Sequence, residues 1–382
     1  MQNQVKASRE IRTIMIVSNT AWSLYNFRLG LACALRDSGF RVVMVAPYDE
    51  YADRIMQAGF EYRPLEFDNS GTNPYHDIKL FFKLLRLYRS LRPVVILHFT
   101  IKVNIYGALA ARFLKIPSLG NITGLGTLFL SDNLIYRAAR YLYLIALRSP
   151  YKVFFQNPAD RDLFLRKEFV RPEQVSLLPG SGVNLNNFKP VKVTPKRQYL
   201  FVGRLIRDKG IFEFVEAARL LKPKYPQVEF AILGDLYLKN PTAVSKATLD
   251  DWIDTGIVRY LGYVDNVQAE MASSECIVLP SYREGLSRVL LEASAMARPI
   301  VASDVPGCND VVDDGVTGFL CEVRSSEDLA LKIEKMINLS PNKRTAMGKA
   351  GRKKIEQQFD EKIVIRMVID VVNKALCNSR LI

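Results

Sequence analysis

The sequence predicts an α/β protein made of two doubly wound domains, each a parallel sheet covered by helices on both faces. Three observations predict this class. Short apolar runs rich in β-branched residues alternate with helical periods along the whole chain. The length of 382 residues is sufficient for two domains that each bury a core. A turn-rich segment near residues 180–196 separates the two series.

In the first half, the apolar runs predict buried strands and the segments between them have helical periodicity. Strands are expected at Ile14–Val17, Val42–Ala46, Val94–Leu97, Val153–Phe155 and Val175–Leu178. Helices are expected at Leu24–Asp37, His76–Leu91, Val103–Leu114 and Leu134–Leu147. Because such sheets bind ligands beyond the carboxyl ends of their strands, we expect the two domains to face each other across a binding cleft.

The second half repeats the scheme. Strands are expected at Tyr199–Val202, Glu229–Leu233, Cys276–Leu279 and Ile300–Ala302. The final segment, Glu361–Leu376, carries an apolar stripe at helical spacing and is expected to pack back toward the N-terminal domain. The predicted organisation is an N-terminal domain at 1–185, a C-terminal domain at 186–360 and a C-terminal helix at 361–382.

Positive charge is concentrated in the N-terminal half. The chain has 53 Lys and Arg residues against 39 Asp and Glu, a formal net charge of +14. Residues 1–190 hold 25 of the basic and 14 of the acidic residues, so +11 of that charge lies there. Such a balance favours an anionic partner: nucleic acid, an anionic membrane surface or a phosphorylated substrate.

Cysteine usage and hydropathy exclude several classes of protein. Five scattered cysteines with no C-x-x-C pair argue against a disulfide framework and structural zinc, and favour a reduced, cytoplasmic protein. The first residues lack the apolar core of a signal peptide. No apolar run approaches the roughly 20 residues that span a bilayer. Contact with a membrane is therefore expected to be peripheral, on its inner face.

The most informative stretch follows the strand that is expected to end at Leu279. A loop carries Glu284-Gly285, and a helix is expected to begin near Leu286. Eight residues advance about 800° on an α-helix, so Glu284 and Glu292 are expected on one face, where one carboxylate can bind a sugar hydroxyl and the other a ribose diol. The alternative is a capping glutamate and a solvent-facing one. Backbone amides at the helix start favour a phosphate. Those amides belong to Gly285, Leu286 and Ser287.

Two other strand ends carry residues suited to a nucleotide. Gly203-Arg204 leaves the strand at Tyr199–Val202, and Lys209-Gly210 opens the next helix. A guanidinium and an ammonium beyond a strand end can neutralise a diphosphate and its developing leaving-group charge, although such a pair in a turn is often only solvated. Gly234 follows the strand at Glu229–Leu233.

With these segments in this order, the sequence resembles retaining nucleotide-sugar glycosyltransferases of the two-Rossmann (GT-B) architecture, whose motif is two glutamates separated by seven residues. The resemblance covers nearly the whole chain. It implies that Glu284, Arg204 and Lys209 are catalytic residues. Arg204 and Lys209 would bind the donor diphosphate, and Glu284 would contact the donor sugar. It implies the donor-binding residues Gly203, Gly234, Gly285, Leu286, Ser287 and Glu292, the last on the ribose. No cofactor is expected besides the UDP-sugar co-substrate.

The N-terminal half is similar to a narrower group, bacterial enzymes that add a sugar, often N-acetylgalactosamine or galactose, to a sugar on undecaprenyl diphosphate. The matching stretches are Ser23–Arg28, Thr72–Pro74, Lys102–Ala111, Gly124–Gly126 and Gly182–Asn184. This similarity implies a lipid diphosphate-linked acceptor and a role in assembling surface polysaccharide or glycan, such as O-antigen. The acceptor-side candidates are Tyr25, Asn26, Arg28, His98, Lys102, Asn104 and Thr123. A buried, hydrogen-bonded core position explains His98 equally well.

The helix expected at His76–Leu91 is basic and amphipathic. Lys79, Lys83 and Arg86 follow helical spacing among long aliphatic residues, and Asp77 is the single acid. Such a helix suits an anionic headgroup layer, and the segment Tyr136–Tyr151 has a similar composition. The alternative is an ordinary surface helix whose cations are solvated.

Asp160-Arg161-Asp162 matches the Asp-x-Asp metal motif of a different glycosyltransferase architecture. Because it follows Asn157-Pro158, we interpret its acids as caps of a helix start and expect no metal requirement.

Other functions stay open at this point. A nucleotide-sugar epimerase of the same architecture would need neither an acceptor nor a basic face. A non-enzymatic nucleic-acid-binding protein would explain the charge, but no binding motif is present and the basic residues lie among aliphatics. No G-x-G-x-x-G follows the first strand, which argues against a dinucleotide dehydrogenase.

Overall fold

The chain folds into two compact units. The computed structural model describes residues 11–68, 73–124, 134–191, 195–238, 240–264 and 266–378, with the backbone alone for 134–140. Unit 1 comprises Met1–Ser181 and Ile365–Ile382, and unit 2 is Gly182–Val364. The division therefore falls within the turn-rich segment near residue 180 and again inside the last helix. None of the helices in the described part of the chain is both long and apolar enough to cross a bilayer.

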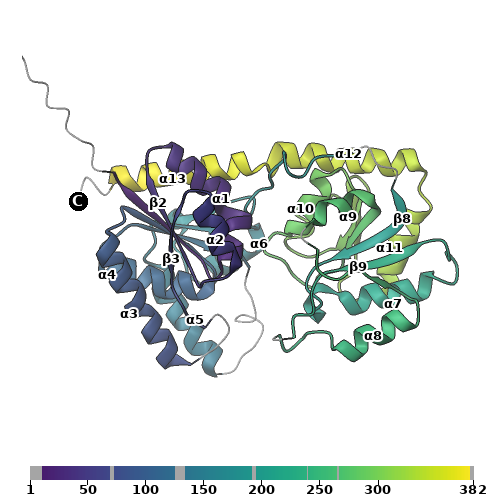
Figure 1. Cartoon of the computed structure of the whole chain (residues 1–382), viewed down its shortest axis with the longest axis horizontal. Coiled ribbons are helices and arrows are strands. Elements are labelled where there is room, and N and C mark those ends of the chain that lie inside the picture. Colours follow the sequence, from purple (N-terminus) through teal and green to yellow (C-terminus); the bar gives the residue numbers. More distant parts are fainter. Residues whose placement is uncertain are drawn as a thin grey trace, which may run out of the picture. The chain divides into compact units, whose positions relative to one another are not determined.

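Unit 1 is built on a parallel sheet with helices packed around it (Figure 1). Its strands are β1 (Thr13–Val17), β2 (Arg41–Ala46), β3 (Glu61–Pro64), β4 (Val95–Phe99), β5 (Ser118–Ile122), β6 (Lys152–Phe155) and β7 (Val175–Leu177). Over the described residues their order is β3-β2-β1-β4-β5-β6-β7, and each neighbouring pair is parallel. The winding direction reverses between β1 and β4, which is the switch point where such sheets bind ligands.

The helices of unit 1 connect successive strands. They are α1 (Ala21–Asp37), α2 (Glu50–Gln57), α3 (Pro74–Leu91), the π-helix η1 (Val103–Gly107), α4 (Ala108–Phe113), α5 (Leu134–Leu147), α6 (Pro158–Arg166) and the 3-10 turn η3 (Pro172–Gln174). Side-chain caps determine several of their starts. Thr20 Oγ1 accepts a hydrogen bond from the Ser23 amide at 3.1 Å before α1, and Asn73 caps α3 with a proline at its first position.

Unit 2 contains a second parallel sheet. Its strands are β8 (Lys196–Val202), β9 (Glu229–Leu233), β10 (Arg259–Tyr260), β11 (Ser274–Leu279), β12 (Ile300–Ser303) and β13 (Gly318–Cys321), in the order β10-β9-β8-β11-β12-β13. Its helices are η4 (Arg207–Lys209, 3-10), α7 (Ile211–Leu221), α8 (Lys246–Asp254), α9 (Val267–Ser273), α10 (Arg288–Ala295), α11 (Ser326–Ile337), α12 (Pro341–Gln358) and the first residues of α13 (Glu361–Asn378). Here the winding reverses between β8 and β11.

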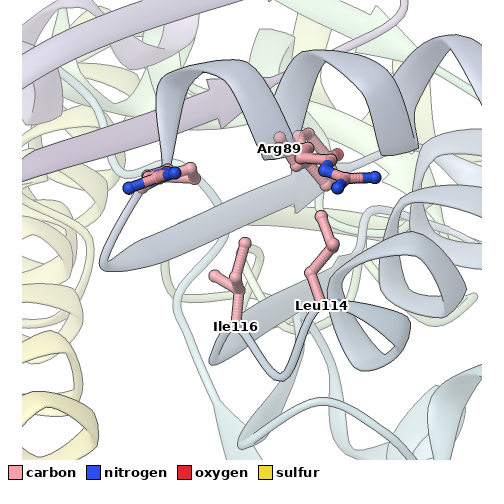
Figure 2. A pocket seen from close by; sticks show the side chains of 6 residues that line it. Arg89, Leu114 and Ile116 are labelled. Atoms are coloured by element: carbon pink, nitrogen blue, oxygen red, sulfur yellow. The ribbon is translucent and has the colours of Figure 1, made fainter.

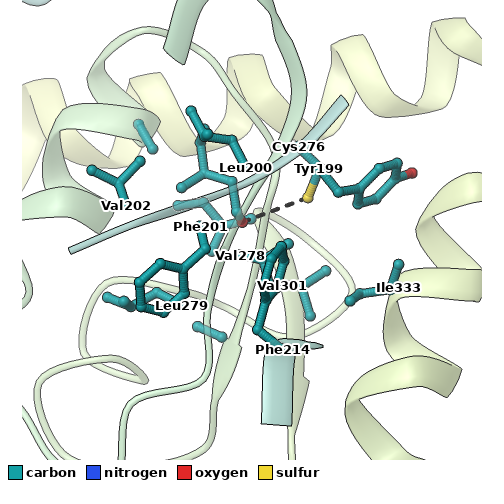
Figure 3. Packing of buried hydrophobic residues seen from close by; sticks show 14 of the residues in the cluster. Tyr199, Leu200, Phe201, Val202, Phe214, Cys276, Val278, Leu279, Val301 and Ile333 are labelled. Atoms are coloured by element: carbon teal, nitrogen blue, oxygen red, sulfur yellow. Dashed lines mark hydrogen bonds between the residues drawn. The ribbon is translucent and has the colours of Figure 1, made fainter. Parts of the chain in front are cut away.

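The core of unit 2 holds β8 and β11 in place. Tyr199 and Phe201 of β8 are fully buried, and the ring of Phe201 lies 5.6 Å from that of Phe214 on α7. Figure 3 shows these side chains together with Cys276 of β11 and Ile333 of α11. Burial raises the pKa of the Cys276 thiol well above its usual value, so this sulfur is an inert core group. The carboxyl ends of β8 and β11 thus emerge from a rigid base.

The two-domain α/β class is confirmed, and the expected central strands are present. In the described part of the chain, four strands were missed: β3, β5, β10 and β13. Each is short or contains glycine, proline or polar residues, so pairing with a neighbour and not its own composition makes it a strand.

The helix expected at Val103–Leu114 begins instead as the π-helix η1. A Cβ at Gly107, the last residue of that turn, would lie 2.7 Å from Nε2 of His98. The widened turn therefore passes close to the end of β4, where only glycine fits.

Candidate functional site

The carboxyl ends of β8 and β11 bring a lysine and a glutamate together. Lys209 ends η4, which follows β8, and Glu284 lies in the loop after β11. Lys209 Nζ is 2.5 Å from Glu284 Oε1, and the same oxygen accepts a hydrogen bond from Ser281 Oγ at 2.7 Å. The two side chains are 21% and 13% exposed, so the pair is largely shielded but remains in reach of a ligand.

The loops that carry this pair are joined to each other. The Tyr282 amide donates to the Asp208 carbonyl at 2.9 Å, and the Tyr282 hydroxyl donates to Glu213 Oε1 at 2.6 Å. Burial, with the Glu213 hydrogen bond, raises the pKa of Tyr282 to about 12, so the hydroxyl keeps its proton at neutral pH. Sequence reasoning missed this connection because Tyr282 and Glu213 belong to segments far apart along the chain.

Two glycines permit the close approach of these loops. Gly210 has φ +71°, and a Cβ there would lie 2.0 Å from the Pro280 carbonyl oxygen. Gly307, in the loop after β12, has φ +82°, and a Cβ there would lie 2.5 Å from the Glu284 carbonyl oxygen. Both positions combine a left-handed backbone with a neighbour that leaves no room for a side chain.

The helix after Glu284 begins two residues later than the expected start near Leu286. Helix α10 begins at Arg288, and Ser287 is its cap. The Ser287 amide, expected to point toward a phosphate, instead donates to the Gly307 carbonyl at 2.9 Å. The Glu284 amide donates to the Pro306 carbonyl at 3.1 Å, which keeps this residue in the loop.

It follows that Glu284 and Glu292 do not share a helix face, because only Glu292 is on α10. Gly285 is buried and Leu286 half-buried in the intervening loop. The serine at 287 is itself a capping signal, and it would have placed the helix start correctly.

Glu292 is held by an arginine one turn earlier on α10. Arg288 Nε donates to Glu292 Oε1 at 2.8 Å, and Arg288 Nη1 donates to the Gly182 carbonyl. Burial raises the pKa of Glu292, and the positive charge of Arg288 opposes that shift. The sequence identified Glu292 but not its arginine partner.

The other expected donor-side residues lie on the same strand ends. The Gly203 amide donates to the Leu233 carbonyl at 3.0 Å, which ties the end of β8 to β9, and Gly234 follows β9. Arg204 is exposed, with its guanidinium carbon 5.2 Å from the ring centroid of Tyr237. The structure therefore joins Lys209 to Glu284, while Arg204 lies against an aromatic ring.

In unit 1, the first helix carries three acceptor-side candidates. Arg28 is buried, with its guanidinium carbon 4.0 Å from the ring centroid of Phe99 at the end of β4. The ring of Tyr25 is half-buried, 5.7 Å from that of Tyr51. Asn26 is exposed and its Nδ2 donates to a carbonyl within the helix, that of Trp22.

His98 and Asn104 lie in the interior of unit 1. His98 is fully buried on β4, with Nε2 3.0 Å from the hydroxyl of Tyr88. Burial lowers the pKa of His98 to about 3, so the ring is neutral at neutral pH. Asn104 Nδ2 donates to the Asn121 carbonyl at 2.7 Å, and Asn121 Nδ2 donates to the His98 carbonyl at 3.1 Å. These side chains tie η1 and the ends of β4 and β5 together.

Lys102 emerges just beyond β4 and forms a small polar cluster with α3. Its Nζ is 2.8 Å from Asp77 Oδ1, and the Tyr106 hydroxyl donates to Asp77 Oδ2 at 2.8 Å. The side chains of Lys102 and Asp77 are each 16% exposed. Thr123, just after β5, is half-buried. The matching residues Thr72, Leu125 and Gly126 lie outside the described residues.

Of the two acids expected at the start of α6, Asp160 lies in the first helical turn, as predicted, whereas the side chain in the N-cap position is that of Asn157. Asn157 is the cap: its Oδ1 accepts from the Asp160 amide at 2.8 Å, and its Nδ2 donates to Asp160 Oδ2 at 3.2 Å. Asp160 is buried in the first turn, whereas Asp162 accepts a hydrogen bond from Arg161. Among the residues that the structure describes, no group of three or more His, Cys, Asp or Glu side chains could hold a metal ion.

The sequence matches two family profiles, one in each half. Residues 184–354 match the family described as Glycosyl transferases group 1, and residues 27–180 match the Glycosyl transferase 4-like domain.

Two relatives of known activity are similar to the chain over most of their length. The N,N'-diacetylbacillosaminyl-diphospho-undecaprenol alpha-1,3-N-acetylgalactosaminyltransferase of Campylobacter jejuni is 26% identical, over 96% of this chain and 99% of the relative. The UDP-Gal:alpha-D-GlcNAc-diphosphoundecaprenol alpha-1,3-galactosyltransferase of Escherichia coli is 26% identical, over 78% of this chain and 81% of the relative.

Solved structures share the fold. A glycosyltransferase from Rickettsia africae superposes with a TM-score of 0.77 at 16% identity, covering 96% of this chain and 99% of that one. HepE of Anabaena, solved with UDP-glucose, gives a TM-score of 0.77 at 19% identity, covering 95% and 99%. The chain therefore has the two-Rossmann (GT-B) fold, and each of its halves matches a glycosyltransferase family, the 4-like domain in the N-terminal half and group 1 in the C-terminal half.

Proposed function

We propose that this glycosyltransferase moves a hexose, N-acetylgalactosamine or a related sugar, from a UDP-sugar to a sugar on undecaprenyl diphosphate, with retention of anomeric configuration and without a metal ion. The product would enter bacterial surface polysaccharide or glycan assembly. The observation that carries the proposal is the Lys209–Glu284 pair at the switch point between β8 and β11.

On the donor side, Lys209 supplies positive charge to the diphosphate and Glu284 a hydrogen-bond acceptor for the sugar. Glu284 is already oriented by Ser281 Oγ, so its carboxylate needs little reorganisation when the sugar binds. Glu292, held by Arg288, is suited to accept hydrogen bonds from the ribose diol. The structures of HepE with UDP and UDP-glucose support the choice of a UDP-sugar as donor.

In the proposed reaction, the bond between the anomeric carbon and the β-phosphate oxygen breaks as the acceptor hydroxyl oxygen bonds to the same face of that carbon. The hydroxyl proton passes to the departing diphosphate, so UDP leaves and no side chain becomes covalently attached. Lys209 and Arg204 would stabilise the charge that develops on the diphosphate. Correct alignment of the acceptor hydroxyl supplies the remaining rate enhancement.

On the acceptor side, Lys102 would contact the lipid diphosphate, because it lies just beyond the carboxyl end of β4 and is held by Asp77. Tyr25, Asn26, Arg28 and Thr123 are the other acceptor-side candidates, and His98 and Asn104 would position the strand ends from within. Both relatives named above act on undecaprenol-linked sugars, which supports this acceptor class. The excess positive charge of the N-terminal half supports a peripheral location on the inner face of the cell membrane, and no nucleic-acid partner is proposed.

The test is a panel of UDP-sugars incubated with a short-chain lipid diphosphate carrying one sugar. We expect UDP release coupled to a product with an α-linkage from an α-configured donor, at an equal rate in excess chelator. A β-linked product would contradict retention, and activity lost in chelator but restored by manganese would contradict metal independence. An isomerised UDP-sugar in the absence of acceptor would identify an epimerase instead.

A further inference from the structure

A cavity of about 260 Å³ opens in unit 1 between the last turn of α3 and the segment that joins α4 to β5. Arg89 lines it from α3, and Leu114 and Ile116 line it from the opposite side (Figure 2). Arg92, Tyr88 and Pro93 complete the lining. The cavity therefore combines two guanidinium groups with an aliphatic wall.

The chain segments that line this cavity carry basic and no acidic side chains. The sequence contains no aspartate or glutamate between Asp77 and Asp132, a span that includes α3 after its first turn, β4, η1, α4 and β5. Arg112 and Lys115 are exposed in the segment that forms the aliphatic wall. Among the described residues, neither the Arg89 nor the Arg92 guanidinium has a hydrogen-bond or ion-pair partner. Their charge is available to a ligand.

The cavity lies at the edge of the sheet away from the candidate acceptor residues. Arg92 and Pro93 precede β4, and Ile116 precedes β5, so the cavity is at the amino ends of these strands. Lys102 and Thr123 follow the carboxyl ends of the same strands. A ligand in this cavity would therefore not occupy the site proposed for the sugar acceptor.

Two residues beside the cavity have a left-handed backbone conformation. Arg92 has φ 45° and Lys115 has φ 57°, the left-handed conformation that glycine prefers at the end of a helix. In the same unit, Gly39 and Gly59 have this conformation at the equivalent turns after α1 and α2. Replacing Arg92 by glycine therefore removes the charge without disfavouring the turn.

We propose that this cavity binds the phosphate group of an anionic lipid, with the phosphate between Arg89 and Arg92 and the adjoining apolar chain against Leu114 and Ile116. Two guanidiniums suit a phosphodiester through charge-assisted hydrogen bonds. The exposed ring of Phe113, 72% accessible and next to the cavity wall in sequence, is placed to enter the same lipid layer. This site goes beyond the proposed transfer reaction, which it does not contact.

Calorimetric titration with dihexanoyl phosphatidylglycerol below its micelle concentration tests the proposal on the full chain. We expect binding that weakens at least fivefold in Arg89→Gln and in Arg92→Gly, and that is lost in the double variant. The control Lys374→Gln removes one exposed charge of unit 1 elsewhere and should bind as the wild type does. Unfolding temperatures should stay at or above the wild-type value in Arg92→Gly, which separates lost binding from lost fold.

Two further ligands distinguish the source of the phosphate. Dihexanoyl phosphatidylcholine, which has no net charge, should bind at least tenfold more weakly. Inorganic phosphate that binds as tightly as the lipid would contradict the role of the aliphatic wall. Equal lipid binding by the wild type and the double variant would overturn the proposal. Sugar transfer to a short-chain acceptor should be unchanged in Arg89→Gln and in Arg92→Gly, because the cavity does not contact the proposed transfer site.

Discussion

Lys209 and Glu284 are 75 positions apart in the sequence, yet Lys209 Nζ lies 2.5 Å from Glu284 Oε1 in the structure. Each charge neutralises the other before any ligand is present. A diphosphate that engages Lys209 must therefore share it with Glu284 or draw it away, and the carboxylate stays oriented in either case because Ser281 also donates to it. The pair couples phosphate binding to the position of the group that would contact the sugar.

Removing either member of this pair should lower turnover. We expect Lys209→Ala and Glu284→Ala each to reduce kcat at least about tenfold, which corresponds to about 1.4 kcal/mol of barrier. The double variant should lose less than the sum of the two, because the residues are in contact. Steady-state kinetics and unfolding temperature give the two readouts. Lys246→Ala, which breaks an exposed ion pair on α8, is the control. Near-wild-type rates in both single variants would refute the assignment.

Gly307 should tolerate no side chain. Gly307→Ala places a Cβ 2.5 Å from the Glu284 carbonyl oxygen, so we expect the Glu284 loop to shift and activity to fall. Gly315→Ala is the matched control, since Gly315 has a similar φ of +73° but no atom within 4 Å of the added Cβ. In both variants the free energy of unfolding should fall by about 1 kcal/mol, because alanine disfavours the left-handed backbone. In Gly307→Ala alone it should fall by about 1–3 kcal/mol more, as measured by chemical denaturation. Equal losses in the two variants would contradict the packing described.

Donor binding should become acid-sensitive when Arg288 is removed. Burial raises the pKa of Glu292 and Arg288 opposes the shift, so Arg288→Gln should raise that pKa further. The carboxylate form exists above the pKa, and its hydrogen bonds to the ribose are lost as the pH falls through it. We therefore expect KM for the UDP-sugar to rise from pH 8 to pH 6 more steeply in the variant.

Arg219→Gln, which disrupts an exposed Arg–Glu pair on α7, is the control for that pH series. Parallel pH profiles for Arg288→Gln and the wild type would show that Glu292 does not contact the donor in its charged form.

Lys102 should affect the acceptor and not the donor. Lys102→Met keeps the aliphatic stem and removes the charge, so we expect KM for a lipid diphosphate acceptor to rise at least about tenfold. KM for the UDP-sugar should be unchanged. Tyr106→Phe should have a smaller effect, because Asp77 still holds Lys102. Lys167→Met serves as an exposed control in unit 1. A rise in donor KM instead would contradict the placement of Lys102 on the acceptor side.

Because of His98, the free energy of unfolding should decrease as the pH falls below about 6.5. Its pKa is lowered to about 3 by burial, against about 6.5 in the unfolded chain. A depressed pKa contributes stability above pH 6.5 that is lost as the pH falls toward 3, since unfolding then takes up a proton. Between pH 6.5 and pH 5, the free energy of unfolding, measured with urea, should fall by about 2 kcal/mol more in the wild type than in His98→Gln. Equal slopes would show that His98 is not buried in its neutral form.

Much of the architecture was predictable from local sequence. The β-branched runs predicted strands close to β1, β2, β8 and β9, and the helix at Leu134–Leu147 has the bounds expected. These features depend on residues that are adjacent in the chain. The edge strand β3 could not be found this way, because its sequence Glu61–Pro64 becomes a strand only through pairing with β2.

The candidate site was predictable in part. Motif spacing identified Lys209, Glu284 and Glu292, but the helical advance over eight residues placed the two glutamates on one face. The backbone hydrogen bond from Glu284 to Pro306 and the cap at Ser287 decide otherwise. Neither is visible in spacing, because Pro306 belongs to the loop after another strand.

The sequence by itself determined the α/β class, the division into two sheets and the chain positions of the charged residues at the strand ends, because apolar periodicity and motif spacing are properties of contiguous residues. Only the tertiary structure decided that Lys209 pairs with Glu284, that His98 lies inside and is neutral, and that Arg89 and Arg92 line a cavity at the amino ends of β4 and β5. The physical reason is that partnership and burial depend on contacts between segments that are far apart in the chain.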